Sequence, residues 1–163
     1  MSPTQPHVEC AVEAVVPLSA MEQIANGIDH AEGICLTPDG TLWVSGEKGQ
    51  IYRIAADGSA TEATTTGGWT LGLAADADGR IYACDPPSRA VMRWTPGSDA
   101  PPEPWSMGAP GRPLRCPNWG AFGPDGAFYY TDPGAWHARD GEILVVRDGQ
   151  TSEWRPAHVD FPN

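Results

Sequence analysis

Residues 32–43 read Glu32-Gly-Ile-Cys-Leu-Thr-Pro-Asp39-Gly40-Thr-Leu-Trp43, and the same arrangement returns in residues 71–82 and 118–129. Each copy has a leading residue, a short apolar run, an Asp-Gly turn seven positions on, and an aromatic residue three positions after the turn glycine. The copies start 39 and then 47 residues apart, a period typical of stacked repeats such as propeller blades. Their common register makes three leading residues structurally equivalent: Glu32, Leu71 and Asn118.

The composition favours short strands over long helices. The 163-residue chain contains 19 Gly, 17 Pro and only 19% charged residues, which suits many strands joined by tight turns. Its hydrophobic content of 40% is ordinary for a globular protein. We therefore predict an all-β fold.

Each repeat divides into four strands separated by turn residues, and in the first repeat the strands are expected over 33–37, 41–45, 50–55 and 60–65. Four antiparallel strands make one blade of a β-propeller. The sequence thus predicts one partial propeller domain over 1–163. Its expected parts are an N-terminal segment over 1–19 with a strand over 8–16, blades over 32–66, 71–107 and 118–155, a connector over 108–113, and the start of a further blade over 160–163.

The charge and the absence of targeting signals limit the partners. A formal net charge of −11 argues against nucleic acid and against an anionic membrane surface. No apolar run approaches the roughly 18 residues of a membrane helix, and the N-terminus lacks the features of a signal peptide, so a cytoplasmic protein is expected. The cysteines at 10, 35, 84 and 116 show no C-x-x-C pairing, which predicts reduced, mostly buried thiols.

The leading residues point to a ligand site. The first strand of each propeller blade lines the central channel, so the leading residues are expected to converge at one mouth of that channel. Glu32 and Asn118 both carry oxygen donors there. Taken singly, Glu32 could cap a loop and Asn118 could form a turn after Pro117; their identical register favours a shared role.

Two segments resemble a known family. They are Ala31-Glu32-Gly33 followed by Pro38-Asp39-Gly40-Thr-Leu-Trp-Val, and Arg115-Cys-Pro-Asn118 followed by Pro124-Asp125-Gly126-Ala-Phe-Tyr-Tyr-Thr-Asp-Pro133. Over residues 20–163 the chain is similar to the gluconolactonase and senescence marker protein (regucalcin) family. That resemblance implies a six-bladed propeller with a divalent cation at the channel mouth, of which this chain would contain about three blades. It also implies a metal-dependent hydrolase that opens a sugar-acid lactone or a similar small-molecule ester.

The resemblance assigns roles to individual residues. Glu32, Asn118 and Asn163 match metal-site positions, Asn163 because it follows Pro162 as Asn118 follows Pro117. Asn118 would also contact substrate, with Arg115 and Trp119 beside it. Carboxylate and amide oxygens suit calcium first, with magnesium, manganese or zinc as alternatives. The family's catalytic Asp would lie beyond Asn163, so the catalytic residue is unknown and the chain alone is expected to be inactive.

The departures from the family pattern leave the substrate open. Trp119 stands where the family usually has Asp, and it could either wall a substrate site or pack between blades. Arg115 precedes Asn118 by three positions instead of two, and could be solvated. His30, two residues before Glu32, is a further candidate for the channel mouth. Asp85 and Asp132, which each precede a proline after a predicted strand, are expected to cap turns.

Three blades do not close a ring, because propellers need about four to eight. We consider two ways of completing the ring. In the first, this chain is the N-terminal half of a longer protein, cut at Asn163. In the second, two copies pair as three plus three blades. A fold does not fix a function, so two alternatives remain. One is a non-catalytic binding module, and the other is a phosphotriesterase-type hydrolase on the same scaffold.

Overall fold

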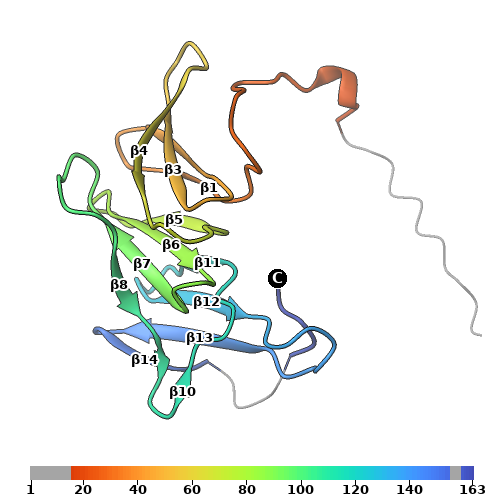
Figure 1. The fold of residues 1–163 in the computed structure, drawn as a ribbon, viewed down its shortest axis with the longest axis vertical. Helices are drawn as coiled ribbons and strands as arrows, with labels where there is room; N and C mark the ends of the chain where they lie inside the picture. The colour runs from red at the N-terminus through yellow and green to blue at the C-terminus, as the bar shows by residue number, and fades with distance from the viewer. Residues whose placement is uncertain (1–15, 155–158) are drawn as a thin grey trace, which may run out of the picture.

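The computed structural model describes residues 16–154 and 159–163. Within them lie three four-stranded antiparallel sheets with the order of strands along the chain (Figure 1). The first sheet comprises β1 (Ile34–Leu36), β2 (Leu42–Ser45), β3 (Gln50–Ile54) and β4 (Ala60–Thr65). The second comprises β5 (Leu73–Ala75), β6 (Ile81–Asp85), β7 (Ala90–Trp94) and β8 (Glu103–Ser106). The third comprises β11 (Gly120–Phe122), β12 (Phe128–Asp132), β13 (Glu142–Arg147) and β14 (Gln150–Glu153). The prediction of an all-β fold is confirmed.

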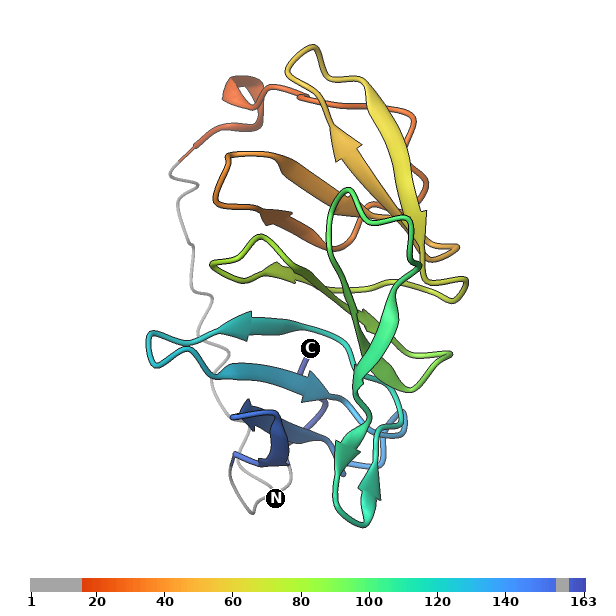
Figure 2. The same ribbon diagram turned by 90° about the vertical axis from the view of Figure 1, so that its left-hand side faces the viewer.

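The sheets are stacked one on another in chain order, as Figure 2 shows. Their first strands β1, β5 and β11 lie side by side, β5 in the middle. Before the first sheet stands a short 3₁₀ turn, η1 (Leu18–Ala20). The strand predicted over 8–16 falls almost wholly outside the described residues. No helix in the described part of the chain is long and apolar enough to cross a membrane.

The segment over 108–113, which the sequence predicted as a connector between blades, is a small hairpin. Its strands are β9 (Gly108–Ala109) and β10 (Arg112–Pro113), which pair antiparallel. The turn between them relies on Gly111, whose φ of 75° suits glycine. Beyond the hairpin, the Leu114 N–H donates a hydrogen bond to the Met107 carbonyl (3.1 Å). The Gly-Pro composition therefore indicates a turn here. The two flanking strands have only two residues each, too few to be recognised from the sequence.

The Asp-Gly turns form as their sequence predicts. The turn glycines Gly40, Gly79 and Gly126 have φ values of 81°, 79° and 76°, which a side chain would disfavour. In the first turn the Gly40 N–H donates to the Thr37 carbonyl (2.8 Å), and Asp39 Oδ1 accepts from the Thr41 N–H (3.0 Å). These bonds join residues within a few positions of each other, so each turn is set locally and fixes the pairing register of its sheet.

The second turn carries a partly buried ionic network that makes stability depend on pH. Burial raises the pKa of Asp76, but hydrogen bonds from Arg80 and from the Tyr82 hydroxyl outweigh it, so the pKa lies below its usual 3.8. A lowered pKa stabilises the fold above the unfolded value, and this stabilisation is lost as the pH falls through the folded value.

We expect Asp76→Asn to flatten the acid side of the stability curve. The variant should be less stable than the parent at neutral pH, and the two should converge as the pH falls below the usual 3.8 and through the lowered pKa of Asp76. Urea unfolding at a series of pH values measures this. The matched control is Asp99→Asn, which changes an exposed loop carboxylate. Parallel curves for parent and Asp76→Asn would contradict the assignment.

The core lies between neighbouring sheets. Side chains alternate along a strand, so the second sheet presents one set to the first sheet and the other to the third. Leu73, Ile81 and Met92 face the first sheet, where Trp43 and Trp94 pack edge to face at 5.6 Å. The other set packs against the third sheet, and all of β6 is buried. The members of this second cluster are Ala74, Tyr82, Cys84, Val91, Leu114, Phe128, Tyr130, Leu144 and Val146.

The outer face of the first sheet is open. In β1, Cys35 packs toward the second sheet, whereas its neighbours Ile34 and Leu36 are 50% and 64% exposed.

Among the described cysteines, Cys84 is buried, Cys35 and Cys116 are half-buried, and none forms a disulfide. Burial raises the pKa of Cys35 to about 12. Cys10 lies outside the described residues.

Candidate metal and substrate site

Hydrogen bonds join the three leading segments along one edge of the stacked sheets. The Gly33 N–H donates to Ser45 Oγ (2.7 Å), and the Ser45 hydroxyl donates to the Leu71 carbonyl (2.9 Å). The next link is the Gly72 N–H, which donates to the Asn118 carbonyl (2.8 Å). The leading residues therefore start neighbouring inner strands at one rim, as their common register predicts. We call this edge the leading rim.

Two glycines make this close approach feasible. A Cβ on Gly33 would overlap the Leu71 carbonyl, and a Cβ on Gly72 would lie 2.8 Å from the Asn118 carbonyl. The glycine that follows Glu32 and Leu71 is thus required by the backbone of the next sheet. The third segment has Trp119 in this place. The Trp119 ring lies against Gly72, where there is no side chain to oppose it, and is 37% exposed.

Asn118 has a fixed backbone and an unpartnered amide. Its N–H donates to the Thr131 carbonyl (2.9 Å) and its own carbonyl accepts from Gly72, so the residue is held on both sides. Its side chain is 9% exposed and makes no hydrogen bond to any residue that the structure describes. A largely buried amide without a partner among the described residues is able to supply an oxygen ligand.

Glu32 is exposed and lies next to His30. The His30 ring bridges two carboxylates, with Nε2 3.9 Å from Glu32 Oε2 and Nδ1 3.7 Å from Glu47 Oε1. His30 has a φ of 39°, which turns the chain just before the leading segment. The leading rim of the first sheet is therefore acidic, with a histidine between the two carboxylates. That His30 faces a channel mouth stays a prediction; the structure shows it beside Glu32.

Asp132 holds the segment that precedes Asn118. Its carboxylate is 3% exposed and accepts the backbone N–H groups of Arg115 (2.6 Å), Cys116 (3.2 Å) and Gly134 (3.0 Å). The expected turn-capping role is present, and it extends to the leading segment itself. No sequence signal beyond the Asp-Pro pair indicated that second contact.

Asp85 occupies the corresponding place in the second sheet with fewer partners. Its Oδ1 accepts from the Trp69 N–H and the Ser88 N–H, both at 3.3 Å. Its Oδ2 is buried and has no hydrogen-bond partner among the described residues. Gly68 packs directly on this carboxylate, since a Cβ there would overlap it. The two aspartates thus cap equivalent loops with different strength.

Arg115 is bound to the loop between β12 and β13. Its guanidinium donates to the Asp140 carboxylate and to the Asp140 carbonyl. Burial raises the pKa of Asp140, but hydrogen bonds from the Ala135 N–H and from Arg115 outweigh this and lower it. The structure therefore places Arg115 in an ion pair that fastens this loop to the leading rim. Its side chain is also 39% exposed, so the ion pair is in contact with solvent.

Asn163 lies at the end of a segment that follows the same loop. Val159 forms a β-bridge with Gly141, and a Cβ on Gly141 would overlap Pro162. Asn163 itself is exposed. No contact joins the side chains of Glu32, Asn118 and Asn163 in the described residues, and these residues contain no group of three or more His, Cys, Asp or Glu arranged to hold a metal. The three-residue metal site stays a prediction.

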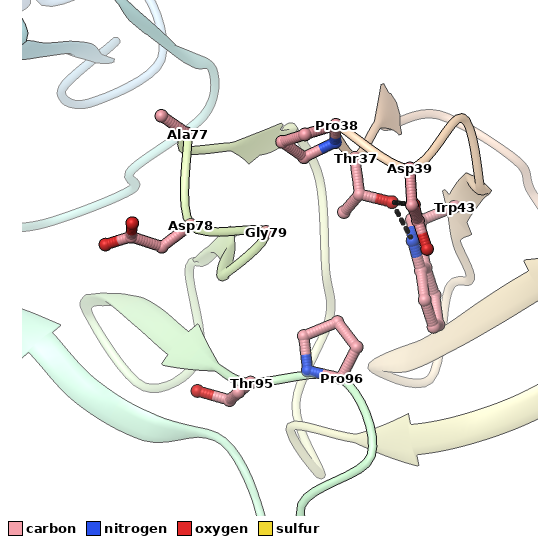
Figure 3. Close-up of a pocket in the computed structure, with 9 residues that line it drawn as sticks. All are labelled: Thr37, Pro38, Asp39, Trp43, Ala77, Asp78, Gly79, Thr95 and Pro96. Carbon is pink, nitrogen blue, oxygen red and sulfur yellow. Dashed lines mark hydrogen bonds between the residues drawn. The ribbon is translucent and has the colours of Figure 1, made fainter.

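The opposite edge of the sheets carries grooves generated by the repeat. One cavity of about 280 Å³ lies between the Asp39-Gly40 and Asp78-Gly79 turns (Figure 3). There the Thr37 hydroxyl donates to Asp39 and accepts from Trp43 Nε1 (3.1 Å), so these polar groups are already paired. A second cavity, of about 540 Å³, lies between the second and third turns. Both grooves lie between successive Asp-Gly turns, so we attribute them to the stacking of the repeats and not to a specific binding site.

Comparisons with known proteins establish the fold. No protein-family model and no curated protein matches the sequence. A gluconolactonase structure from Xanthomonas campestris, described as important in glucose secondary metabolic pathways, is 22% identical with a TM-score of 0.73, covering 86% of this chain and 51% of that protein. A structure of a protein described as a putative gluconolactonase is 20% identical with a TM-score of 0.68, over 81% of this chain and 50% of that one. The chain thus spans about half the length of these proteins, and the predicted β-propeller fold is confirmed.

The fold is shared by proteins of other activities. Virginiamycin B lyase from Staphylococcus aureus is 18% identical with a TM-score of 0.61, over 81% of this chain and 43% of the lyase. A PQQ-bound aldose sugar dehydrogenase from Streptomyces coelicolor is 24% identical with a TM-score of 0.59, over 79% of this chain and 48% of the dehydrogenase. A function for this chain must therefore be argued from the leading rim and its side chains.

Proposed function

We propose that the leading rim is part of the active site of a metal-dependent lactonase that opens a sugar-acid lactone or a similar ester. One observation carries the proposal: Glu32 and the unpartnered amide of Asn118 occupy equivalent positions on segments that Ser45 and Gly72 bond into one rim. A largely buried amide without a protein partner in the described part of the chain is free to bind a ligand. The gluconolactonase structures with the same fold support lactone hydrolysis as the activity.

The residues present fit a hard divalent cation. Glu32 supplies a negative charge and Asn118 a neutral oxygen, a donor set that suits calcium first and magnesium, manganese or zinc less well. The net charge of −11 attracts cations to the protein as a whole. A cation held there would polarise a lactone carbonyl and lower the pKa of a bound water. Asn163 would complete the set from the segment beside the β12–β13 loop.

The protein groups have distinct tasks in this proposal. Asp132 and Thr131 keep the backbone of residues 115–118 in place, so the Asn118 amide is aimed without a hydrogen bond of its own. Trp119 covers Gly72 and leaves a partly exposed aromatic surface for an apolar part of the substrate. The catalytic base and the remaining ligands would come from further blades or from a second copy. The chain alone would then be inactive.

Calcium titration of the full-length protein tests the proposal. Glu32→Gln keeps the size of the side chain and removes its charge, so we expect calcium affinity to fall at least about tenfold, comparable with the loss of an important metal-site group. Glu47→Gln is the matched control, because it changes a neighbouring exposed carboxylate outside the repeated register. Equal calcium binding by the parent and Glu32→Gln would favour a binding module with a structural Glu32. Assays with a lactone and with a phosphotriester then separate the two hydrolase classes.

A further inference from the structure

The loop between β12 and β13 and the C-terminal segment enclose a cavity that the repeat does not explain. It measures about 300 Å³ and is lined by Trp136, His137, Arg139, Asp160 and Phe161. Figure 1 shows the C-terminal residues beside this loop. The same loop contains Asp140, which binds Arg115, so the cavity belongs to the leading-rim edge of the molecule. Its size is at the lower end of small-molecule sites.

Aromatic rings form one wall of the cavity. Trp136 is 72% exposed, yet its ring is held edge to face by Phe161 at 4.7 Å and by His137 at 5.0 Å. An exposed Trp that is clamped by two rings presents a fixed apolar surface to solvent. Large apolar side chains that are exposed and pre-positioned in this way are a mark of binding sites.

The backbone around the cavity is held in an uncommon conformation. His137, Arg139 and Phe161 have φ values of 63°, 54° and 45°, in the left-handed region that side chains disfavour. Half of the six non-glycine residues with positive φ in the described chain thus line this one cavity. Such outliers gather at functional sites, where they aim side chains that a relaxed backbone would direct elsewhere.

The polar wall offers both donors and acceptors. Arg139 Nε lies 3.6 Å from Asp160 Oδ2, and both side chains are mostly exposed. That separation is too long for a hydrogen bond, so the guanidinium and the carboxylate keep their bonding capacity for a ligand. Their charges cancel, and the pair therefore selects neither a cation nor an anion.

We propose that this cavity binds a neutral polyhydroxylated ring, such as a sugar ring. The apolar face of the ring would lie on Trp136, while its hydroxyls donate to Asp160 and accept from Arg139. A flat apolar ring would leave the Arg-Asp pair unused, and an ion would be repelled by one member of it. None of the proposed metal-site residues lines the cavity, but Asn163 belongs to the same C-terminal segment as Asp160 and Phe161, so the test is run without metal.

The test is an NMR titration of the full-length protein with methyl β-D-glucopyranoside in the presence of EDTA. This glycoside has no lactone carbonyl, so binding does not report hydrolysis or metal. The Trp136 indole resonance should shift saturably. We expect Trp136→Ala and Arg139→Met each to weaken binding at least about fivefold, the effect of losing one good aromatic or polar contact.

Trp154→Ala is the matched control. Trp154 is another partly exposed Trp, and its ring packs on that of Tyr129 with the centroids 5.8 Å apart. It does not line the cavity, so its replacement should leave binding within about twofold. The absence of a saturable shift, or unchanged binding by both cavity variants, would overturn the proposal. So would saturable binding of phenol at the same residues without binding of the glycoside, because the site would then be selective for aromatic rings.

Discussion

Replacing Phe128 by Ala is expected to lower the free energy of unfolding by about 4 kcal/mol, in the range for a fully buried Phe. The Phe128 ring is 1% exposed and stands at the centre of an aromatic cluster. Its centroid lies 4.9 Å from that of Phe122, 5.5 Å from that of Trp105 and 5.6 Å from that of Tyr82. Because these rings come from both the second and third sheets, the substitution leaves a cavity in the packing between these two sheets.

The surroundings of Phe128 have little freedom to close the cavity. A Cβ on Gly120 would overlap the Phe128 ring, so β11 already rests directly on it and cannot move closer without breaking its pairs with β12. Phe122→Ala is the control, because Phe122 belongs to the same cluster but is only half-buried, and a loss about half as large is expected. Urea unfolding of the three proteins measures both effects. Similar losses for the two variants would mean that the cluster is not centred on Phe128.

The sequence predicted the parts of the fold that depend on short-range interactions. The turn at Asp39-Gly40 is held by bonds that span four residues or fewer, and the equivalent turns repeat its geometry. Alternation along β6 then decides which side chains face each neighbouring sheet. Turn positions and approximate strand positions thus followed from local sequence, and the period of the copies followed from counting.

The contacts between loops could not be predicted in this way. Arg115 binds Asp140 across 25 residues, and Trp136 meets Phe161 across a comparable separation. Neither pair belongs to the repeated pattern, so no second copy in the chain indicates it. The resemblance to a family suggested Arg115 as a substrate contact, which stays a prediction; the structure adds the ion pair with Asp140 that holds the loop. A repeat defines equivalent positions, whereas the partners of a loop depend on how the backbone between them is placed.

The same distinction applies to the candidate metal site. Glu32 and Asn118 were paired by register, and the hydrogen bonds through Ser45 and Gly72 bring their segments to one rim. No group of metal-ligating side chains forms around them within the described residues, so convergence of these side chains on one ion stays a prediction. The shared rim is therefore a property of this chain, and the ligand set awaits the calcium titration.

Replacing Asp132 by Ala is expected to lower the free energy of unfolding by about 3 kcal/mol. The substitution removes one acceptor from three backbone N–H groups, and each buried donor left without a partner costs about 1 kcal/mol or more. Asp85→Ala is the natural comparison, because Asp85 has the equivalent position but accepts two longer bonds and keeps one oxygen without a partner. Its loss should be clearly smaller, although both carboxylates are buried.

The two aspartates should also differ in their effect on metal binding. Asp132 fixes the N–H groups of Arg115 and Cys116, directly before Asn118, whereas Asp85 fixes Trp69 before the apolar Leu71. If Asn118 is a ligand, Asp132→Ala should weaken calcium binding in the folded protein and Asp85→Ala should not. Chemical unfolding and calcium titration on the same samples separate stability from affinity. Equal calcium affinities for both variants, with both still folded, would remove Asn118 from the metal site and leave Asp132 with a purely structural role.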